Sequence, residues 1–98
     1  MAKGTAHYKL RHVKDMLAAG QMKMTYVAYA GAARMKLDWH GVRDILVGLE
    51  PADFYKSMTA YEDHRVWQDV YRPVTRYGGL YVKLTMTDQV LVVSFKPR

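Results

Sequence analysis

Cations, an amide and aromatic rings are interleaved in one stretch of the sequence, FYKSMTAYEDHRVWQDVYRP, residues 54–73. Five aromatic side chains stand there with Lys56, Gln68 and Arg72. Burying so many polar groups is costly, so we expect a working surface with an apolar wall behind it. Single-stranded RNA would suit this surface, because bases stack on aromatic rings and phosphates need cations. These residue types serve a protein that only binds RNA as readily as one that cuts it.

Other kinds of site have little support in the sequence. The chain has no cysteine, which excludes disulfides, a thiolate nucleophile and a cysteine zinc site. Its histidines lack the spacing of metal ligands: His7, His12, His40 and His64. Gly78-Gly79 reads as a turn rather than a phosphate-binding loop, and Ser57 and Ser94 have no nucleophile-elbow context. We therefore expect neither a metal nor a cofactor.

The length and charge of the chain set further bounds. Its 98 residues predict one domain, residues 1–98, because two halves would each be too short for a core. The net charge of +6 divides into +6 for residues 1–36, −4 for residues 37–69 and +4 for residues 70–98. If the basic ends meet in the fold, they form a face that attracts a polyanion; the alternative is a solvated Lys/Arg surface. The acidic middle argues against coating of duplex DNA, so we expect no direct DNA binding.

The compartment is predicted from features that the sequence lacks. No apolar run and no small-residue cleavage site follow the first charged residues, unlike in a secretory signal. No apolar stretch approaches the roughly 20 residues of a membrane helix. The absence of cysteine suits a reducing compartment. We expect a cytoplasmic protein that makes no contact with a membrane.

The first half of the chain predicts helices. HYKLRHVKDMLAAG places Leu10, Val13 and Leu17 on one face, and Gly20 can end that helix. QMKMT predicts a short edge strand. In YVAYAGAARMKL, Thr25 is the expected N-cap, and the face of Tyr26, Tyr29, Ala33 and Leu37 predicts core packing for both tyrosines. Asp38 should cap WHGVRDILVGL, whose apolar stripe is Val42, Ile45, Leu46 and Leu49, and Pro51 should begin a short helix reaching Met58.

The second half of the chain changes to strand periodicity. VWQDVYR and GLYVKLTMT alternate, and VLVVSFK, apolar on both faces, predicts a central strand. RPVTRYGG predicts a longer turn, and Asp88 with Gln89 a tight one. Helices followed by an antiparallel meander predict an α+β domain with the helices on one face of the sheet. The other face should then hold Tyr81, Lys83, Gln68 and Arg72, with Lys56 above them, while Phe54, Trp67 and Val70 form the core wall.

Several segments resemble one known family. DFYKSMT, WQDVYRP, VYRP…YVKLT, VLVVSFK and the N-terminal AGQ are similar to the motility quorum-sensing regulator toxins, the MqsR family. The resemblance covers the whole chain and is strongest over residues 45–96. It implies a RelE-like, microbial-ribonuclease type of fold. It also implies the toxin of a type II toxin–antitoxin system, an endoribonuclease (mRNA interferase) that cuts messenger RNA at GC-containing sites, inhibits translation and arrests growth. The implied partner is a cognate MqsA-type antitoxin, which mediates any DNA binding.

The resemblance also assigns roles to residues of this chain. The family's catalytic positions correspond to Lys56, Gln68 and Tyr81. The positions around its site, which we take as substrate-binding, correspond to Tyr55, Met58, Arg72 and Lys96. Relatives have a histidine between the last two strands, where this chain has Asp88. Any substrate contact by that histidine would therefore be missing here.

A metal-independent cleavage is the reaction that these side chains suggest. The ribose 2′-OH would attack the adjacent phosphate, Lys56 and Arg72 would hold the phosphate, Tyr81 would donate or relay a proton and Gln68 would position the substrate. The alternative is a non-catalytic module that binds nucleic acid or protein through the same basic face. An inhibitor could add a strand to the edge of the first or last strand of the sheet, or block the site sterically.

Overall fold

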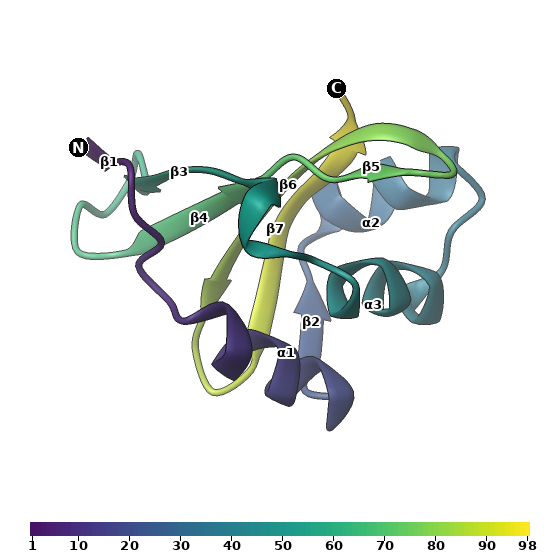
Figure 1. Cartoon of the computed structure of the whole chain (residues 1–98), viewed down its shortest axis with the longest axis horizontal. Coiled ribbons are helices and arrows are strands. Elements are labelled where there is room, and N and C mark those ends of the chain that lie inside the picture. The colour runs from purple at the N-terminus through teal and green to yellow at the C-terminus, as the bar shows by residue number, and fades with distance from the viewer.

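The protein is an α+β structure in which three α-helices and one short 3-10 helix lie beside a seven-stranded, mostly antiparallel sheet (Figure 1). The computed structural model describes all 98 residues. The helices are α1 (Leu10–Ala18), α2 (Tyr26–Arg34), α3 (Trp39–Val47) and the short 3-10 helix η1 (Pro51–Asp53). The strands are β1 (Ala2–Lys3), β2 (Met22–Met24), β3 (Phe54–Thr59), β4 (Trp67–Tyr71), β5 (Val74–Thr75), β6 (Gly78–Met86) and β7 (Val90–Pro97). None of the helices is long and apolar enough to cross a membrane.

The order of the strands is β1-β3-β4-β6-β7-β2, and β5 forms a hairpin with β6. All pairs are antiparallel except β2 with β7. The predicted meander of the second half and the predicted edge strand at QMKMT are therefore confirmed. The last strand, β7, is not an open edge: β2 pairs with Val90–Val92, and α2 lies against the strand beyond them. The possibility that an inhibitor adds a strand to β7 is therefore wrong for this fold. The terminal strands of the sheet are β1 and β2.

The helix boundaries follow the capping signals of the sequence. The Thr25 hydroxyl accepts a hydrogen bond from the Ala28 amide at 3.1 Å, and the Asp38 carboxylate accepts one from the Gly41 amide at 2.9 Å. Each cap satisfies an amide that the first turn leaves without an intrahelical partner. Gly20 adopts a φ of +78° just after α1, a conformation that costs glycine little. All three predictions are confirmed.

The hydrophobic core lies between one face of the sheet and helices α1 and α3, with α2 closing its side. Its 15 buried residues are Val13, Leu17, Met22, Ala28, Ala32, Val42, Leu46, Leu49, Tyr71, Leu80, Val82, Leu84, Val90, Val92 and Phe95. Phe54 packs against this cluster, as expected of a core wall. Val70 is also fully buried but lies outside the cluster, because it alternates with Tyr71 along β4 and points to the opposite face.

Helix α2 turns a different face to the core than its tyrosines suggest. Tyr26 and Tyr29 are 83% and 56% exposed, so the prediction that they pack in the core is wrong. The buried face is instead formed by Ala28, Gly31 and Ala32. A Cβ on Gly31 would collide with the carbonyl oxygen of Phe95. The helix lies so close to β7 that only small residues fit between the two backbones, which forces the large tyrosines outward.

The predicted helix from Pro51 to Met58 is also wrong. Only Pro51–Asp53 is helical, and Phe54–Thr59 is the strand β3. Proline starts a helical turn in either case, but the β-branched and aromatic residues that follow can pair with β4, and that pairing decides the structure. Lys56 is therefore part of the sheet and not carried above it.

The N-terminal segment crosses the helix side of β4 and is held there by Asp69. This buried carboxylate accepts hydrogen bonds from the backbone amides of His7 at 3.0 Å and Tyr8 at 2.9 Å. The His7 ring stacks on Trp67 with centroids 5.2 Å apart. Trp67, expected in the core wall, is only partly buried and lies under this segment instead.

Candidate functional site

Four adjacent strands place the candidate residues on the sheet face that points away from the core, called the open face below. One row of side chains runs straight across it. Lys56 on β3 pairs with Val70 on β4, Val70 pairs with Lys83 on β6, and Lys83 pairs with Ser94 on β7. Cross-strand partners project to the same side of a sheet. The row therefore carries two lysines separated by a buried valine.

Neighbouring rows add the remaining residues. Met58 pairs with Gln68, and Tyr81 pairs with Lys96, whose Nζ lies 5.3 Å from the centre of the Tyr81 ring. Because side chains two residues apart share a face, Gln68 stands beside Val70 and Tyr81 beside Lys83. The residues named from the resemblance as catalytic, Lys56, Gln68 and Tyr81, thus share one face with Met58 and Lys96.

A hollow of about 530 Å³ opens at one end of this face. It is lined by Tyr55, Arg72, Tyr81 and Arg98. The register of β3 shifts between Phe54 and Lys56, and Tyr55, at this irregularity, is 49% exposed. The Arg72 guanidinium carbon lies 4.5 Å from the centre of the Tyr55 ring. A flat ring held against a cation can accept a base on its free side and a phosphate beside it.

Lys83 lies at the centre of the site, although the sequence did not identify it as a functional residue. The sequence predicts it on this face but gives it no function. The pKa of Lys83 is lowered by burial and by repulsion from Lys96 and Lys56. Each cause disfavours the charged form of an amine. The three lysines repel one another because no counter-ion lies between them. Binding of an anion such as phosphate would relieve this repulsion, so the cluster is suited to an anionic ligand.

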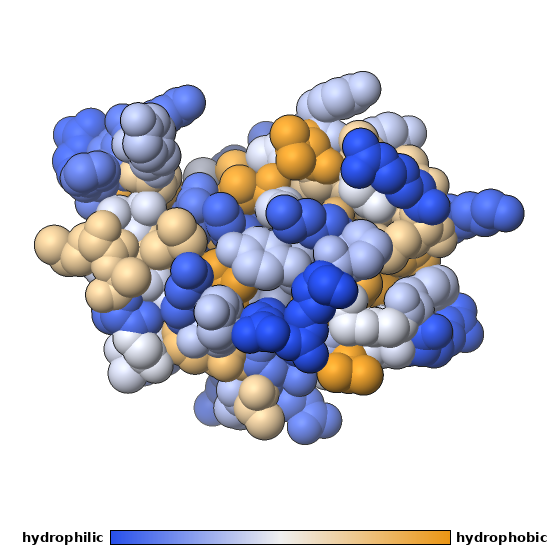
Figure 2. Space-filling view, turned by 90° about the horizontal axis from the view of Figure 1, so that it is seen from above, coloured by the Kyte–Doolittle hydropathy of each residue, from blue (hydrophilic) through white to orange (hydrophobic).

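No carboxylate neutralises the cations of the open face. The two side-chain ion pairs of the protein are Arg43–Asp44 and Arg65–Asp63, and neither includes a residue of this face. Asp88 lies in the turn between β6 and β7, where its carboxylate accepts a hydrogen bond from the Thr87 hydroxyl at 3.0 Å. Seen from above, the side of the molecule near the C-terminus shows hydrophilic side chains gathered over its middle (Figure 2). The open face is therefore free to bind a polyanion.

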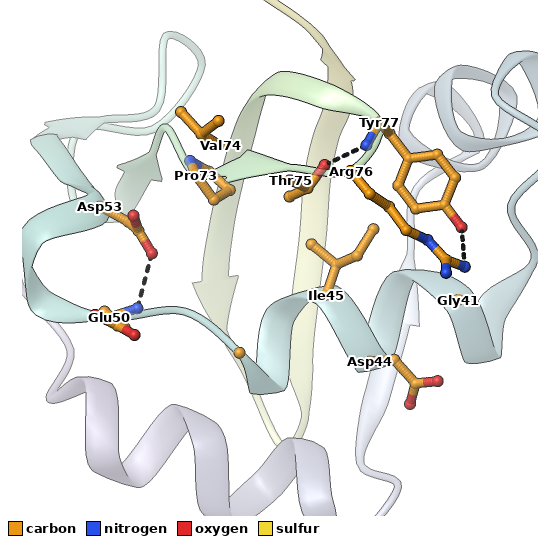
Figure 3. A pocket seen from close by; sticks show the side chains of 11 residues that line it. Gly41, Asp44, Ile45, Glu50, Asp53, Pro73, Val74, Thr75, Arg76 and Tyr77 are labelled. Carbon is orange, nitrogen blue, oxygen red and sulfur yellow. Dashed lines mark hydrogen bonds between the residues drawn. The ribbon is translucent and has the colours of Figure 1, made fainter.

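A second hollow of about 530 Å³ has the opposite character (Figure 3). It lies between α3 and the β5 hairpin, and Asp44, Glu50 and Asp53 contribute carboxylates to it. Asp53 uses one carboxylate oxygen to accept the Glu50 amide at 2.8 Å. Three acids near one cation, Arg76, make this hollow unfavourable for RNA. The protein holds no cluster of three or more side chains suited to a metal ion.

Comparison with known proteins gives two findings. A family model described as "Motility quorum-sensing regulator, toxin of MqsA" matches residues 5–97. A curated protein of Escherichia coli (strain K12), the mRNA interferase toxin MqsR, is 46% identical over 98 residues, which is 100% of this chain and 100% of that protein. The similarity therefore covers the whole of both chains and is not limited to a single motif.

Proposed function

The chain belongs to the family of the motility quorum-sensing regulator, toxin of MqsA, and from that premise we propose that it is an mRNA interferase, the toxin of a toxin–antitoxin pair. The observation that carries this proposal is the row Lys56, Val70 and Lys83 with Tyr81 and Gln68 beside it. Lysine ammonium groups can stabilise the charge that develops on phosphate, a phenol can transfer a proton and an amide can position the substrate. Here these groups share one face.

The reaction we propose begins with attack of a ribose 2′-oxygen on the adjacent phosphorus. The new P–O bond forms a 2′,3′-cyclic phosphate and the bond to the 5′-oxygen breaks. The 2′ proton passes to Tyr81 or to solvent water as a proton is given to that 5′-oxygen. Lys56 and Arg72 hold the phosphate and its developing charge, Tyr81 donates or relays the proton, and Gln68 positions the sugar. Catalysis then depends mainly on orientation and electrostatic stabilisation.

Tyr55, Met58 and Lys96 have the binding roles in this proposal. Tyr55 offers its exposed ring to a base, and Lys96 extends the positive charge past Tyr81. Met58, the cross-strand partner of Gln68, supplies an adaptable apolar contact. We further propose a RelE-like fold, cleavage at GC-containing sites, and inhibition by an antitoxin of the MqsA type in the cytoplasm. The family description, toxin of MqsA, supports the antitoxin partner.

The test is cleavage of a GC-containing RNA by purified protein in EDTA, comparing wild type with Lys56→Ala and Tyr81→Phe. Loss of one phosphate-stabilising group should lower the rate by about 100-fold or more. Tyr61→Phe is the matched control, because Tyr61 is 97% exposed in the loop after β3. Both site variants must keep the wild-type circular dichroism spectrum. Full activity in a folded Lys56→Ala or Tyr81→Phe protein would show that these residues are not catalytic.

The same assay distinguishes an enzyme from a module that only binds. Binding without product, with affinity falling steeply as salt rises, would identify a non-catalytic protein. Expression in cells adds a second readout. The chain alone should arrest growth, and the gene next to it should relieve the arrest; unimpaired growth with abundant folded protein would contradict the toxin assignment.

A further inference from the structure

A narrow groove borders the open face on its α2 side. Its volume is about 190 Å³, well below the roughly 300–1,000 Å³ of sites that enclose a whole small molecule. Its lining includes Tyr26, Gly31 and Arg34 on α2 and Ser94, Phe95 and Lys96 on β7. A space of this size between a helix and a strand suits one unit of a longer polymer better than a free ligand.

The groove is built by the close approach of α2 to β7. The buried residues Ala28, Gly31 and Ala32 hold the helix against the strand where a further strand would otherwise pair. The Thr25 amide and hydroxyl donate to the carbonyl oxygens of Val92 at 3.0 Å and Val93 at 2.8 Å, which fixes the start of the helix. The exposed side of α2 therefore stands rigidly beside the end of β7.

The groove is continuous with the candidate active site. Ser94 and Lys96 line it, and these two residues are the cross-strand partners of Lys83 and Tyr81. Lys96 therefore belongs to both places, since its ammonium also lies near the Tyr81 ring. A strand of RNA held at Tyr81 and Lys83 and extended across β7 would enter this groove next.

The side chains of the groove match the chemistry of a nucleotide. Tyr26, 83% exposed, offers a ring for stacking. Arg34 and Lys96 are exposed cations, neither takes part in an ion pair, and no carboxylate lines the groove. Stacked aromatic rings beside cations are the usual elements of single-strand binding. An apolar protein partner would be a poorer match, because two cations would be desolvated without a counter-charge.

We propose that the groove between α2 and β7 is a subsite for a nucleotide outside the cleaved step of the RNA, where Tyr26 stacks on the base and Arg34 binds the phosphate. This inference rests on the proposed function. It gives a role to the exposed ring of Tyr26, which the packing of α2 leaves in solvent. The subsite would make affinity depend on the length of the RNA as well as on its sequence.

The test compares two uncleavable, 2′-O-methylated oligonucleotides that contain the same GC step, one spanning only that step and the other extended on both sides. The readout is the ratio of the two dissociation constants. We expect wild type to gain affinity with the extension. Tyr26→Ala should lose about tenfold of that gain because the base loses its stacking partner, and Arg34→Ala should lose about as much because a phosphate contact is removed. Arg34→Ala should also lower the salt slope for the long RNA by about 0.7.

Matched controls are Tyr61→Ala and Arg11→Ala, an exposed tyrosine and an exposed arginine on other elements. Both should keep the wild-type ratio. An unchanged ratio of dissociation constants in Tyr26→Ala and Arg34→Ala would overturn the proposal. It would do so even if these variants bound the antitoxin more weakly, because the groove would then serve the antitoxin and not RNA. No RNA is cut in this binding assay, so it tests the subsite independently of the proposed cleavage. If the cleavage proposal alone is wrong, the wild type will bind the two oligonucleotides with the expected ratio but yield no product from unmodified RNA.

Discussion

Lys56 on β3 and Lys83 on β6 are both cross-strand partners of Val70, so two ammonium groups flank one fully buried valine on the open face. Val70 is outside the core cluster, and from the register we infer that the four-carbon stems of the two lysines cover it. Each lysine would thus lay its aliphatic stem on Val70 and keep its ammonium group in solvent. The arrangement places one cation on each side of β4, where both can contact the phosphates of a bound strand.

Replacing Lys83 by methionine should stabilise the protein while lowering its activity. The lowered pKa of Lys83 means that the unfolded chain binds this proton more tightly than the folded chain. Its cost is fully present below the lowered pKa, and stability rises with pH from the lowered pKa to the ordinary value of 10.5. We expect Lys83→Met to raise Tm slightly at pH 7, to remove this alkaline gain, and to slow RNA cleavage at least about tenfold.

Lys83→Arg separates a cation at this position from a base. Arginine keeps its charge at every accessible pH, so a cationic role predicts activity that persists to higher pH than in wild type. Rate–pH profiles of the two proteins provide the comparison. An inactive Lys83→Arg protein with a normal Tm would contradict the cationic role and would assign proton acceptance to Lys83.

Arg72→Ala should weaken RNA binding through the hollow next to Tyr81. The guanidinium is stacked on Tyr55 and is free to bind phosphate. We expect KM to rise about tenfold and the salt slope to fall by about 0.7, and Arg72→Lys to restore little, because lysine lacks the planar group that stacks. Arg76→Ala is the control, since Arg76 lies 5.1 Å from the Tyr77 ring but on the β5 hairpin. Equal effects of the two alanine substitutions would show that the change reflects net charge alone.

Gly31→Ala should destabilise the protein although alanine is the better helix former. In an exposed helix the change would add about 1 kcal/mol of stability. Here the new Cβ would meet the carbonyl oxygen of Phe95, a backbone atom that cannot rotate away. Overpacking of this kind costs roughly 1–3 kcal/mol. Urea denaturation should show the loss, with Ala33→Gly on the exposed side of the same helix as the control for propensity alone; a more stable Gly31→Ala protein would contradict the close approach of α2 to β7.

The sequence correctly predicted the helix ends and the direction of strand side chains, because interactions between residues close in the sequence determine both. Thr25, Asp38 and Gly20 end or begin helices through hydrogen bonds within a few residues, and the structure confirms all three. The alternation of the β6 segment likewise predicted that Tyr81 and Lys83 share a face, because side-chain direction in a strand has a fixed period.

The predictions were wrong where a contact with backbone far away in the sequence determines the local structure. Pro51 starts a turn, but pairing with β4 converts residues 54–58 to strand, and no local signal reveals that partner. Tyr26 and Tyr29 recur at helical spacing, yet the contact of Gly31 with Phe95 selects the face of small residues. The run of small residues at positions 28, 30–33 was the available signal, since close helix packing needs residues without bulk.

The site was predictable as a set of residue types and only partly as geometry. The resemblance named Lys56, Gln68 and Tyr81, and the register shows that they share a face, while their catalytic roles stay predictions. The importance of Lys83 depends on two lysines from other strands, 27 residues before it and 13 after it, so it becomes apparent only when the register is known.

Tyr71 should make the fold sensitive to alkali. Burial, and then the charge of Asp69, raises the pKa of Tyr71 to about 12 from 10.0, because both disfavour the phenolate. The folded state therefore keeps a proton that the unfolded chain loses above pH 10, and the stabilisation present below pH 10 is lost as pH rises toward 12. We expect urea stability to fall by roughly 2 kcal/mol over this interval, and Tyr71→Phe to show a smaller fall because its ring cannot ionise. A Tyr71→Phe protein with the same alkaline slope as wild type would assign the loss to other groups, and the contribution of Tyr71 to folding would then be its packing alone.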